Sequence, residues 1–148
     1  MQPRMSVPPA VAKILILLVA AALSAAAGFG AVYAIFEWLP RIDDAAGHGL
    51  ASVYTLFAMA LYVLVTAVVF GIAAFRADPA TRLRRGLWAL LIAPLFILIF
   101  GMTDTGLNVN LKKELVGAAQ LFVPLWVVAA VQWVVWRWYM GRTTRADT

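Results

Sequence analysis

The titratable residues that could perform chemistry in this chain gather in polar segments between long apolar runs. Carboxylates beside an imidazole can bind a divalent cation, and Asp44 and His48 would share one helical face at a spacing of four residues. The spacing of the whole group matches no metal-ligand pattern, and short loops need polar side chains to be wetted. We therefore predict a polar "acidic rim" with no bound metal, made of Glu37, Asp43, Asp44, His48, Asp104 and Glu114.

Most other kinds of reactive site are excluded or disfavoured by the residues present. The chain has no Cys and one His, which excludes thiolate chemistry and haem held by two imidazoles. The G-x-S-x-G and P-loop motifs are also missing from the sequence. We predict no cofactor and no catalytic residue. A membrane enzyme that acts on a lipid-linked substrate through the acidic-rim carboxylates and His48 stays open as an alternative.

Four arginines lie close together between the second and third apolar runs: Arg76, Arg82, Arg84 and Arg85. Guanidinium groups beside a membrane contact the phosphates of anionic lipids, so we predict lipid headgroup binding here. Charge that only sets the topology is the simpler alternative. The formal net charge is +5 and the pI is about 10.1. In a soluble protein this excess of positive charge would indicate binding to nucleic acid. Here the basic residues flank apolar runs, and we expect no nucleic-acid partner.

The apolar runs must position these residues. The chain is 64% hydrophobic and 13% charged, with a mean hydropathy of +0.90, whereas soluble domains are about 45–50% apolar. Runs of about 20 apolar residues cross a bilayer as helices. We predict an all-α integral membrane protein with a single transmembrane domain over residues 1–148 and helices at residues 11–39, 50–75, 83–102 and 112–140. The first run continues well past the small residues 24–27, so we expect an uncleaved helix rather than a signal peptide.

The basic residues indicate how these helices are oriented. Of the 12 Lys and Arg residues, only Arg41, Lys112 and Lys113 lie in the first and third connections. The positive-inside rule then places both termini in the cytoplasm and the acidic rim outside. We predict an antiparallel four-transmembrane-helix bundle, N-in and C-in, in a bacterial inner membrane. Asp78 followed by Pro79 fits the start of the third helix.

Two rows of small residues mark where the first helix packs. Helices in lipid associate through small residues that let backbones approach closely, and each row has a four-residue spacing. We predict helix packing at Ala20, Ser24, Gly28, Ala22, Ala26 and Gly30. The first helix is thereby expected at the centre of the bundle or at a seam between subunits. Pro94 and Pro124 fall near mid-membrane, where each removes a backbone hydrogen bond and predicts a kink.

The middle of each predicted span contains no charged residue. An intramembrane ionisable group is the usual mark of proton transfer or transport, and here the deep polar residues are neutral. Gln120 and Gln132 are expected to bond to neighbouring helices, because buried amides need partners. An aromatic face on the fourth helix consists of Phe122, Trp126, Trp133 and Trp136. Such a face could receive a quinone, a lipid tail or a partner helix, but we interpret it as bundle core or interfacial belt.

Together these observations favour a protein that works through its surfaces. We predict a non-enzymatic small polytopic membrane protein that acts as a subunit, anchor or accessory component of a membrane assembly. Its expected partners are the bilayer, anionic lipids at the cytoplasmic loop, and further copies of itself or other membrane proteins. Besides the enzyme, one more alternative stays open: an oligomeric channel or carrier for a cation or small solute, with the acidic rim attracting cations.

Overall fold

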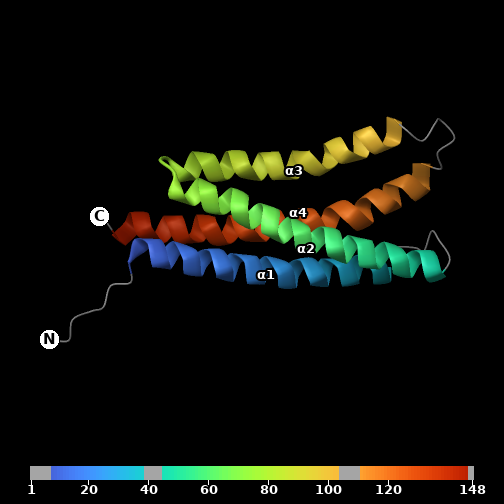
Figure 1. Cartoon of the computed structure of the whole chain (residues 1–148), viewed down its shortest axis with the longest axis horizontal. Helices are drawn as coiled ribbons and strands as arrows, with labels where there is room; N and C mark the ends of the chain where they lie inside the picture. Colours follow the sequence, from blue (N-terminus) through green and yellow to red (C-terminus); the bar gives the residue numbers. More distant parts are fainter. Residues whose placement is uncertain (1–7, 39–44, 104–110, 147–148) are drawn as a thin grey trace.

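Four long helices make up the part of the chain that the computed structural model describes, which is residues 8–38, 45–103 and 111–146. They are α1 (Pro9–Trp38), α2 (Ala45–Phe75), α3 (Pro79–Thr103) and α4 (Leu111–Ala146) (Figure 1). The all-helical prediction is confirmed. α2 and α3 begin earlier than predicted, and α4 continues further, because residues outside the apolar runs, such as His48, Arg82 and Arg142, are helical as well.

A tight turn joins α2 to α3. Pro79 is the first residue of α3, where its missing N–H costs nothing and its fixed φ suits a helix. The preceding Asp78 adopts a φ of 54°, a left-handed conformation that Asp tolerates better than most residues. The backbone N–H of Arg82 donates to the Asp78 carbonyl at 3.3 Å, and the Arg82 Nε donates to the Ala77 carbonyl at 2.9 Å. These bonds fix the first turn of α3 to the residues of the connecting turn.

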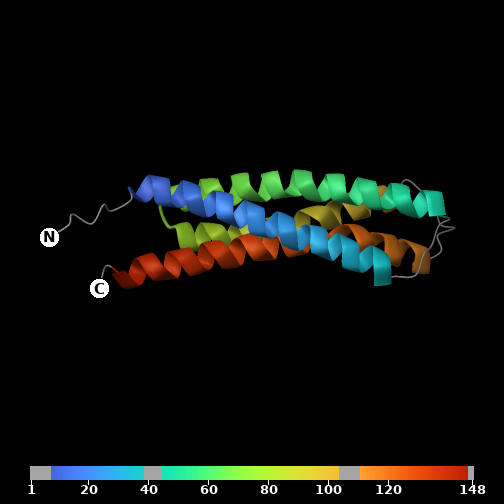
Figure 2. The same cartoon turned by 90° about the horizontal axis from the view of Figure 1, so that it is seen from below.

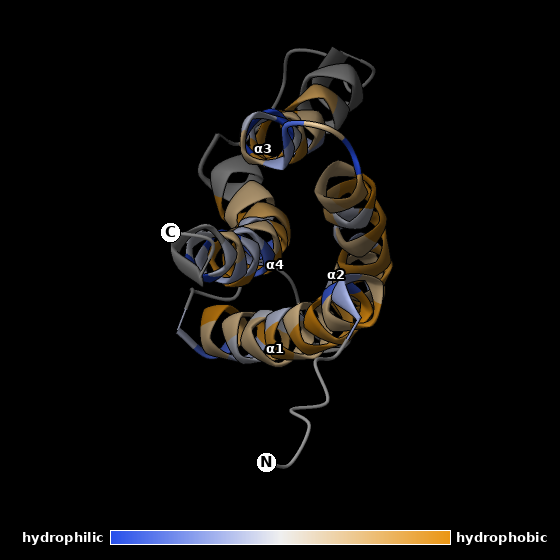
Figure 3. Ribbon diagram, turned by 90° about the vertical axis from the view of Figure 1, so that its left-hand side faces the viewer, coloured by the Kyte–Doolittle hydropathy of each residue, from blue (hydrophilic) through white to orange (hydrophobic). Residues whose placement is uncertain are grey.

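The helices follow one another around the bundle in chain order, as the end-on view shows (Figure 3). α2 and α4 each contact every other helix, whereas α1 and α3 do not touch in the described residues. Of the two positions expected for the first helix, the centre of the bundle is therefore not observed, and a seam between subunits stays a prediction. Small residues show where a helix is approached closely, but they do not show how many neighbours it has. α1 runs obliquely relative to α2 and packs along α2 and α4 (Figure 2).

Three helical segments in the described residues are long and apolar enough to cross a membrane: Pro9–Trp38, Gly47–Phe75 and Val116–Thr143. This finding supports a membrane protein. α3 does not meet the same criterion in its described part, because Arg82, Arg84 and Arg85 fall in its first two turns. Its apolar segment is correspondingly shorter than those of the other helices.

Both prolines inside the helices are fully buried, and α3 and α4 change direction along their length (Figure 1). Pro94 cannot donate to the carbonyl of Leu90 one turn earlier, so that oxygen needs another donor. The hydroxyl of Tyr62 on α2 donates to it. The indole Nε1 of Trp126 on α4 donates to the next carbonyl, that of Leu91, at 3.1 Å. Neighbouring helices thus satisfy the backbone beside the kink in α3.

Candidate functional site

The interior of the bundle contains a neutral polar cluster where three helices meet. The amide Nε2 of Gln132 on α4 donates to the Ser24 hydroxyl on α1 at 3.0 Å and to the Val63 carbonyl on α2 at 3.2 Å. The hydroxyl of Ser24 donates to the Ala21 carbonyl at 2.9 Å. Gln132 and Ser24 have no exposed surface. This cluster ties helices together, as predicted for Gln132, and contains no group that ionises.

Three buried polar atoms lack a hydrogen-bond partner in the described protein: Gln120 Nε2, Gln132 Oε1 and Trp136 Nε1. An unsatisfied polar atom in a dry environment costs free energy. Among the described residues, no hydrogen bond joins Gln120 to a neighbouring helix as expected. The three groups are neutral and do not ionise near neutral pH, so they are not proton-transfer groups.

The two small-residue rows of α1 have different surroundings. Ala20, Ser24 and Gly28 are buried. A Cβ built on Gly28 would lie 2.7 Å from Met59 Sδ and 2.7 Å from Val128 Cγ2, so α2 and α4 approach this point too closely for any side chain. By contrast, the second row is exposed: Ala22, Ala26 and Gly30. A Cβ on Gly30 would have no neighbour within 4 Å among the described residues.

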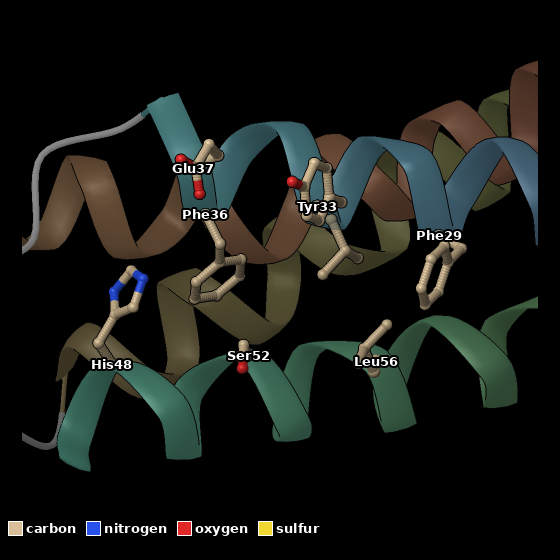
Figure 4. Close-up of a pocket in the computed structure, with 8 residues that line it drawn as sticks. Phe29, Tyr33, Phe36, Glu37, His48, Ser52 and Leu56 are labelled. Atoms are coloured by element: carbon tan, nitrogen blue, oxygen red, sulfur yellow. The ribbon is translucent and has the colours of Figure 1, made fainter. Parts of the chain in front are cut away.

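The structure brings two acidic-rim residues together at the end of the bundle away from the α2–α3 turn. Glu37 near the end of α1 and His48 near the start of α2 line one pocket (Figure 4). Glu114 belongs to the first turn of α4, but its side chain is outside the described part of the structure. Asp43, Asp44 and Asp104 also lie outside the described residues, so the predicted Asp44–His48 pair has no structural counterpart here.

The pocket at this rim has an apolar interior and a polar mouth. It has a volume of about 290 Å³ and lies between α1 and α2. Phe29 and Leu56 lie toward one end of the pocket and Glu37 and His48 toward the other, with Ser52 between them (Figure 4). Val32, which is buried, also lines the pocket. The ring of Phe36 meets the His48 imidazole edge-to-face, with centroids 5.2 Å apart. This arrangement can hold an apolar chain with a polar group at its end.

The opposite end of the bundle contains every Lys and Arg side chain that the structure describes. Arg76, Arg82, Arg84 and Arg85 surround the α2–α3 turn, as predicted, and all four are exposed. Of these arginines, only Arg84 lines a described pocket, which it shares with Arg137 of α4. Arg82 is engaged with the Ala77 carbonyl. The four arginines predicted to act together therefore differ in their contacts: Arg84 lines a pocket, whereas Arg82 bonds to the backbone of the turn.

Lys13 has a structural role that the sequence did not reveal. Its Nζ donates to the carbonyl of Ala74 at 2.9 Å and lies 5.1 Å from the centroid of the Phe75 ring. A cation at the end of α2 satisfies one of the carbonyls that lack an intrahelical partner. Lys13 thereby fastens the start of α1 to the end of α2. The sequence places it at this end of the bundle but does not identify its partner.

The predicted aromatic face of α4 divides between core and surface. Phe122 stacks on Trp126, with centroids 6.1 Å apart, and packs into a core cluster with Met59 and Val63. Trp136 is fully buried in a second cluster with Phe70 and Leu83. Trp133, in contrast, lines the basic pocket beneath Arg137. The face is therefore mainly bundle core and does not form one continuous apolar surface.

Comparison of the chain with known protein families, with curated proteins and with solved structures finds no match. The described residues also contain no group of three or more His, Cys, Asp and Glu side chains placed to hold a metal ion. The features of this protein that bear on function are the two pockets, the neutral interior and the exposed face of α1.

Proposed function

We propose that this protein is a non-enzymatic, membrane-embedded component of a larger assembly, which contacts a transmembrane helix of a partner or of a second copy through the outward face of α1. The observation that carries this proposal is the uncovered row of Ala22, Ala26 and Gly30. Small residues allow close helix contact, and van der Waals contact drives helix association in lipid. α1 uses one such row within its own fold and leaves the other open.

The neutral interior supports a structural role. The buried polar residues of the described chain are Ser24, Thr55, Thr66, Gln120 and Gln132. The Thr66 hydroxyl oxygen lies 2.8 Å from the Tyr62 carbonyl oxygen and 3.0 Å from that of Val63, so its single proton is shared between two acceptors of α2. Groups that move ions or protons through a membrane are usually ionisable. Here polar groups close to the centre are used to connect or stabilise helices.

The proposal includes four membrane spans, with both termini in the cytoplasm of a bacterial cell. α3 lies alongside α2 and α4, and its arginines are at the same end as the start of α1 and the end of α4 (Figure 1). That end would face the cytoplasm under the positive-inside rule. Because the chain has no native Cys, single-cysteine variants Gly49→Cys and Thr143→Cys can be labelled with a membrane-impermeant maleimide in intact cells. Labelling of Gly49→Cys alone supports this topology, and labelling of Thr143→Cys alone would reverse it.

A second candidate function is favoured by the pocket at the acidic rim. Its apolar walls would hold the chain of a lipid-linked substrate, and Glu37 and His48 would contact the polar group at its mouth. The two side chains could then serve as a general base and a general acid. This proposal keeps His48 from the sequence-based enzyme hypothesis and, of the acidic-rim carboxylates, uses Glu37. The channel alternative rests mainly on acidic-rim side chains that lie outside the described part of the structure.

A photoreactive polyprenyl phosphate tests this second candidate. Occupation of the pocket predicts crosslinked peptides from residues 29–37 and 48–56, with the yield reduced in a Phe29→Ala, Leu56→Ala variant. Leu64 is also apolar and exposed on α2 but is distant from the pocket in sequence and does not line it, so Leu64→Ala serves as the control. Crosslinks spread evenly along α1 and α2, unaffected by either variant, would contradict a specific pocket.

A further inference from the structure

We propose that the basic end of the bundle has a binding site for the phosphate of an anionic phospholipid, located between α3 and α4, with Arg84 and Arg137 as its cationic residues. This site is independent of the docking face on α1. It differs from the headgroup binding predicted from the sequence in two respects. It uses one arginine of the α2–α3 region rather than four, and it adds an arginine from α4.

The geometry of this basic pocket suits a headgroup with the beginning of an acyl chain. The pocket has a volume of about 600 Å³, within the range of small-molecule sites. α3 contributes Thr81, Leu83 and Arg84, and α4 contributes Trp133, Arg137 and Met140. Leu83 is buried and Trp133 is partly buried, so they provide an apolar wall. The side chains of Arg84 and Arg137 are exposed, so a ligand can reach their guanidinium groups.

The charge of the pocket selects an anion. Two cations from different helices line it, and none of the described residues that line it is acidic. Arginine donates several N–H groups in a planar fork that matches phosphate oxygens. The guanidinium of Arg137 lies over the Trp133 ring, 5.1 Å from its centroid. This contact holds the guanidinium at the edge of the pocket.

Its position favours a lipid over a free anion. The pocket lies where the apolar parts of α3 and α4 give way to basic residues, which is the level of the headgroups when the apolar segments lie in the bilayer. The exposed Trp138 and Arg142 continue this surface along α4, with the Arg142 guanidinium carbon 3.9 Å from the Trp138 ring centroid. Tryptophan and arginine together are typical of the membrane interface. A phospholipid can therefore place its phosphate between the arginines and its glycerol and upper acyl carbons against Leu83 and Trp133.

The experiment compares two double variants that remove the same charge. Arg84→Gln, Arg137→Gln removes both cations of the pocket, whereas Arg76→Gln, Arg85→Gln removes two arginines that do not line it. The full chain is purified in a neutral detergent, and phosphatidylglycerol adducts are counted by native mass spectrometry during a titration. Both pocket arginines would donate charge-assisted hydrogen bonds to the phosphate, which arginines outside the pocket would not. Loss of both pocket arginines should therefore weaken the first adduct by roughly tenfold or more.

Two control variants and a competing anion distinguish a specific lipid site from general electrostatic attraction. The Arg76→Gln, Arg85→Gln pair should change the first adduct by less than about threefold, because a diffuse charge effect is small in comparison. The Arg84→Lys, Arg137→Lys pair should bind with intermediate affinity, because it keeps the charge but loses the planar fork. Equal weakening by the two Gln pairs would overturn the site in favour of general electrostatic attraction. Equally effective displacement of the adduct by glycerol phosphate, which has no acyl chain, would overturn the lipid and leave a free-anion site.

Discussion

The two small-residue rows of α1 have nearly the same composition and opposite surroundings. Ala20, Ser24 and Gly28 pack inside the bundle, and Gly28 is so close to Met59 and Val128 that it leaves no space for a Cβ. Ala22, Ala26 and Gly30 face outward, and Gly30 has open space where a Cβ would be. The comparison shows that small residues alone do not identify a contact within one chain. One row builds the fold, and we propose that the other contacts a partner in the same membrane.

The largest loss of unfolding free energy is expected in the buried row of Ala20, Ser24 and Gly28, here called the inner row. Gly28→Ile would force a branched side chain against Met59 and Val128, and overpacking of this kind costs about 3 kcal/mol. The free energy of unfolding, measured by denaturant titration in detergent micelles, should fall by that amount. A change below about 0.5 kcal/mol would mean that α1 does not pack as described.

A smaller effect is expected for a bond that does not involve α1. Tyr62→Phe removes the donor to the Leu90 carbonyl beside Pro94, and interhelical hydrogen bonds contribute about 0.6–1.7 kcal/mol. The loss should shrink in a Pro94→Ala background, because an N–H within α3 then satisfies the same carbonyl. A double-mutant cycle of unfolding free energies measures this coupling. If the losses of unfolding free energy from Tyr62→Phe and Pro94→Ala were additive, the hydrogen bond of Tyr62 would not compensate for the proline.

Ser24→Ala should have a still smaller effect, although Ser24 lies in the inner row. Gln132 loses one acceptor but keeps the Val63 carbonyl, so the loss of unfolding free energy should be about 0.6 kcal/mol. Gly28→Ile and Ser24→Ala, measured in the same micelles, separate tight packing from hydrogen bonding on the inner row. A loss as large as that of Gly28→Ile would reverse this ranking.

The smallest effect on stability is expected in the exposed row of Ala22, Ala26 and Gly30, here called the outer row. Gly30→Ile places the same side chain on the same helix, but into open space. Its unfolding free energy should stay within about 0.5 kcal/mol of the parent protein. Circular dichroism during the same titration checks that the helix content is retained. A loss comparable to that of Gly28→Ile would show that the outer row is already covered within the bundle.

The helices could be predicted because the length and apolarity of a segment are properties of the local sequence. They can be recognised without knowing how the helices pack. The sequence could not tell the two rows of α1 apart, because α1 is apolar on all sides and presents no polar face to mark the outside. The sequence likewise could not identify which side chains form hydrogen bonds between helices. Pro94 predicted an unpaired carbonyl, but the choice of Tyr62 as its donor depends on how α2 is rotated.

The candidate sites were predictable only in part. The sequence placed Glu37 and His48 at one end of the bundle, and the structure adds that they share a pocket with apolar walls. It also grouped Arg84 with three neighbours along the chain, whereas in the structure Arg84 shares a pocket with Arg137 from the last helix. A contact between residues that are distant in sequence depends on helix packing, which local patterns do not determine.

The central claim is that the outward row of α1 contacts another transmembrane helix. Because the chain has no native Cys, Ala26→Cys and Leu64→Cys can each carry a photoreactive maleimide at an exposed apolar position of a different helix. In native membranes, illumination should give a discrete crosslinked product from position 26, none from position 64, and none from position 26 when Gly30→Ile is added. Equal products from both positions, or a product at position 26 that persists with Gly30→Ile, would contradict the account.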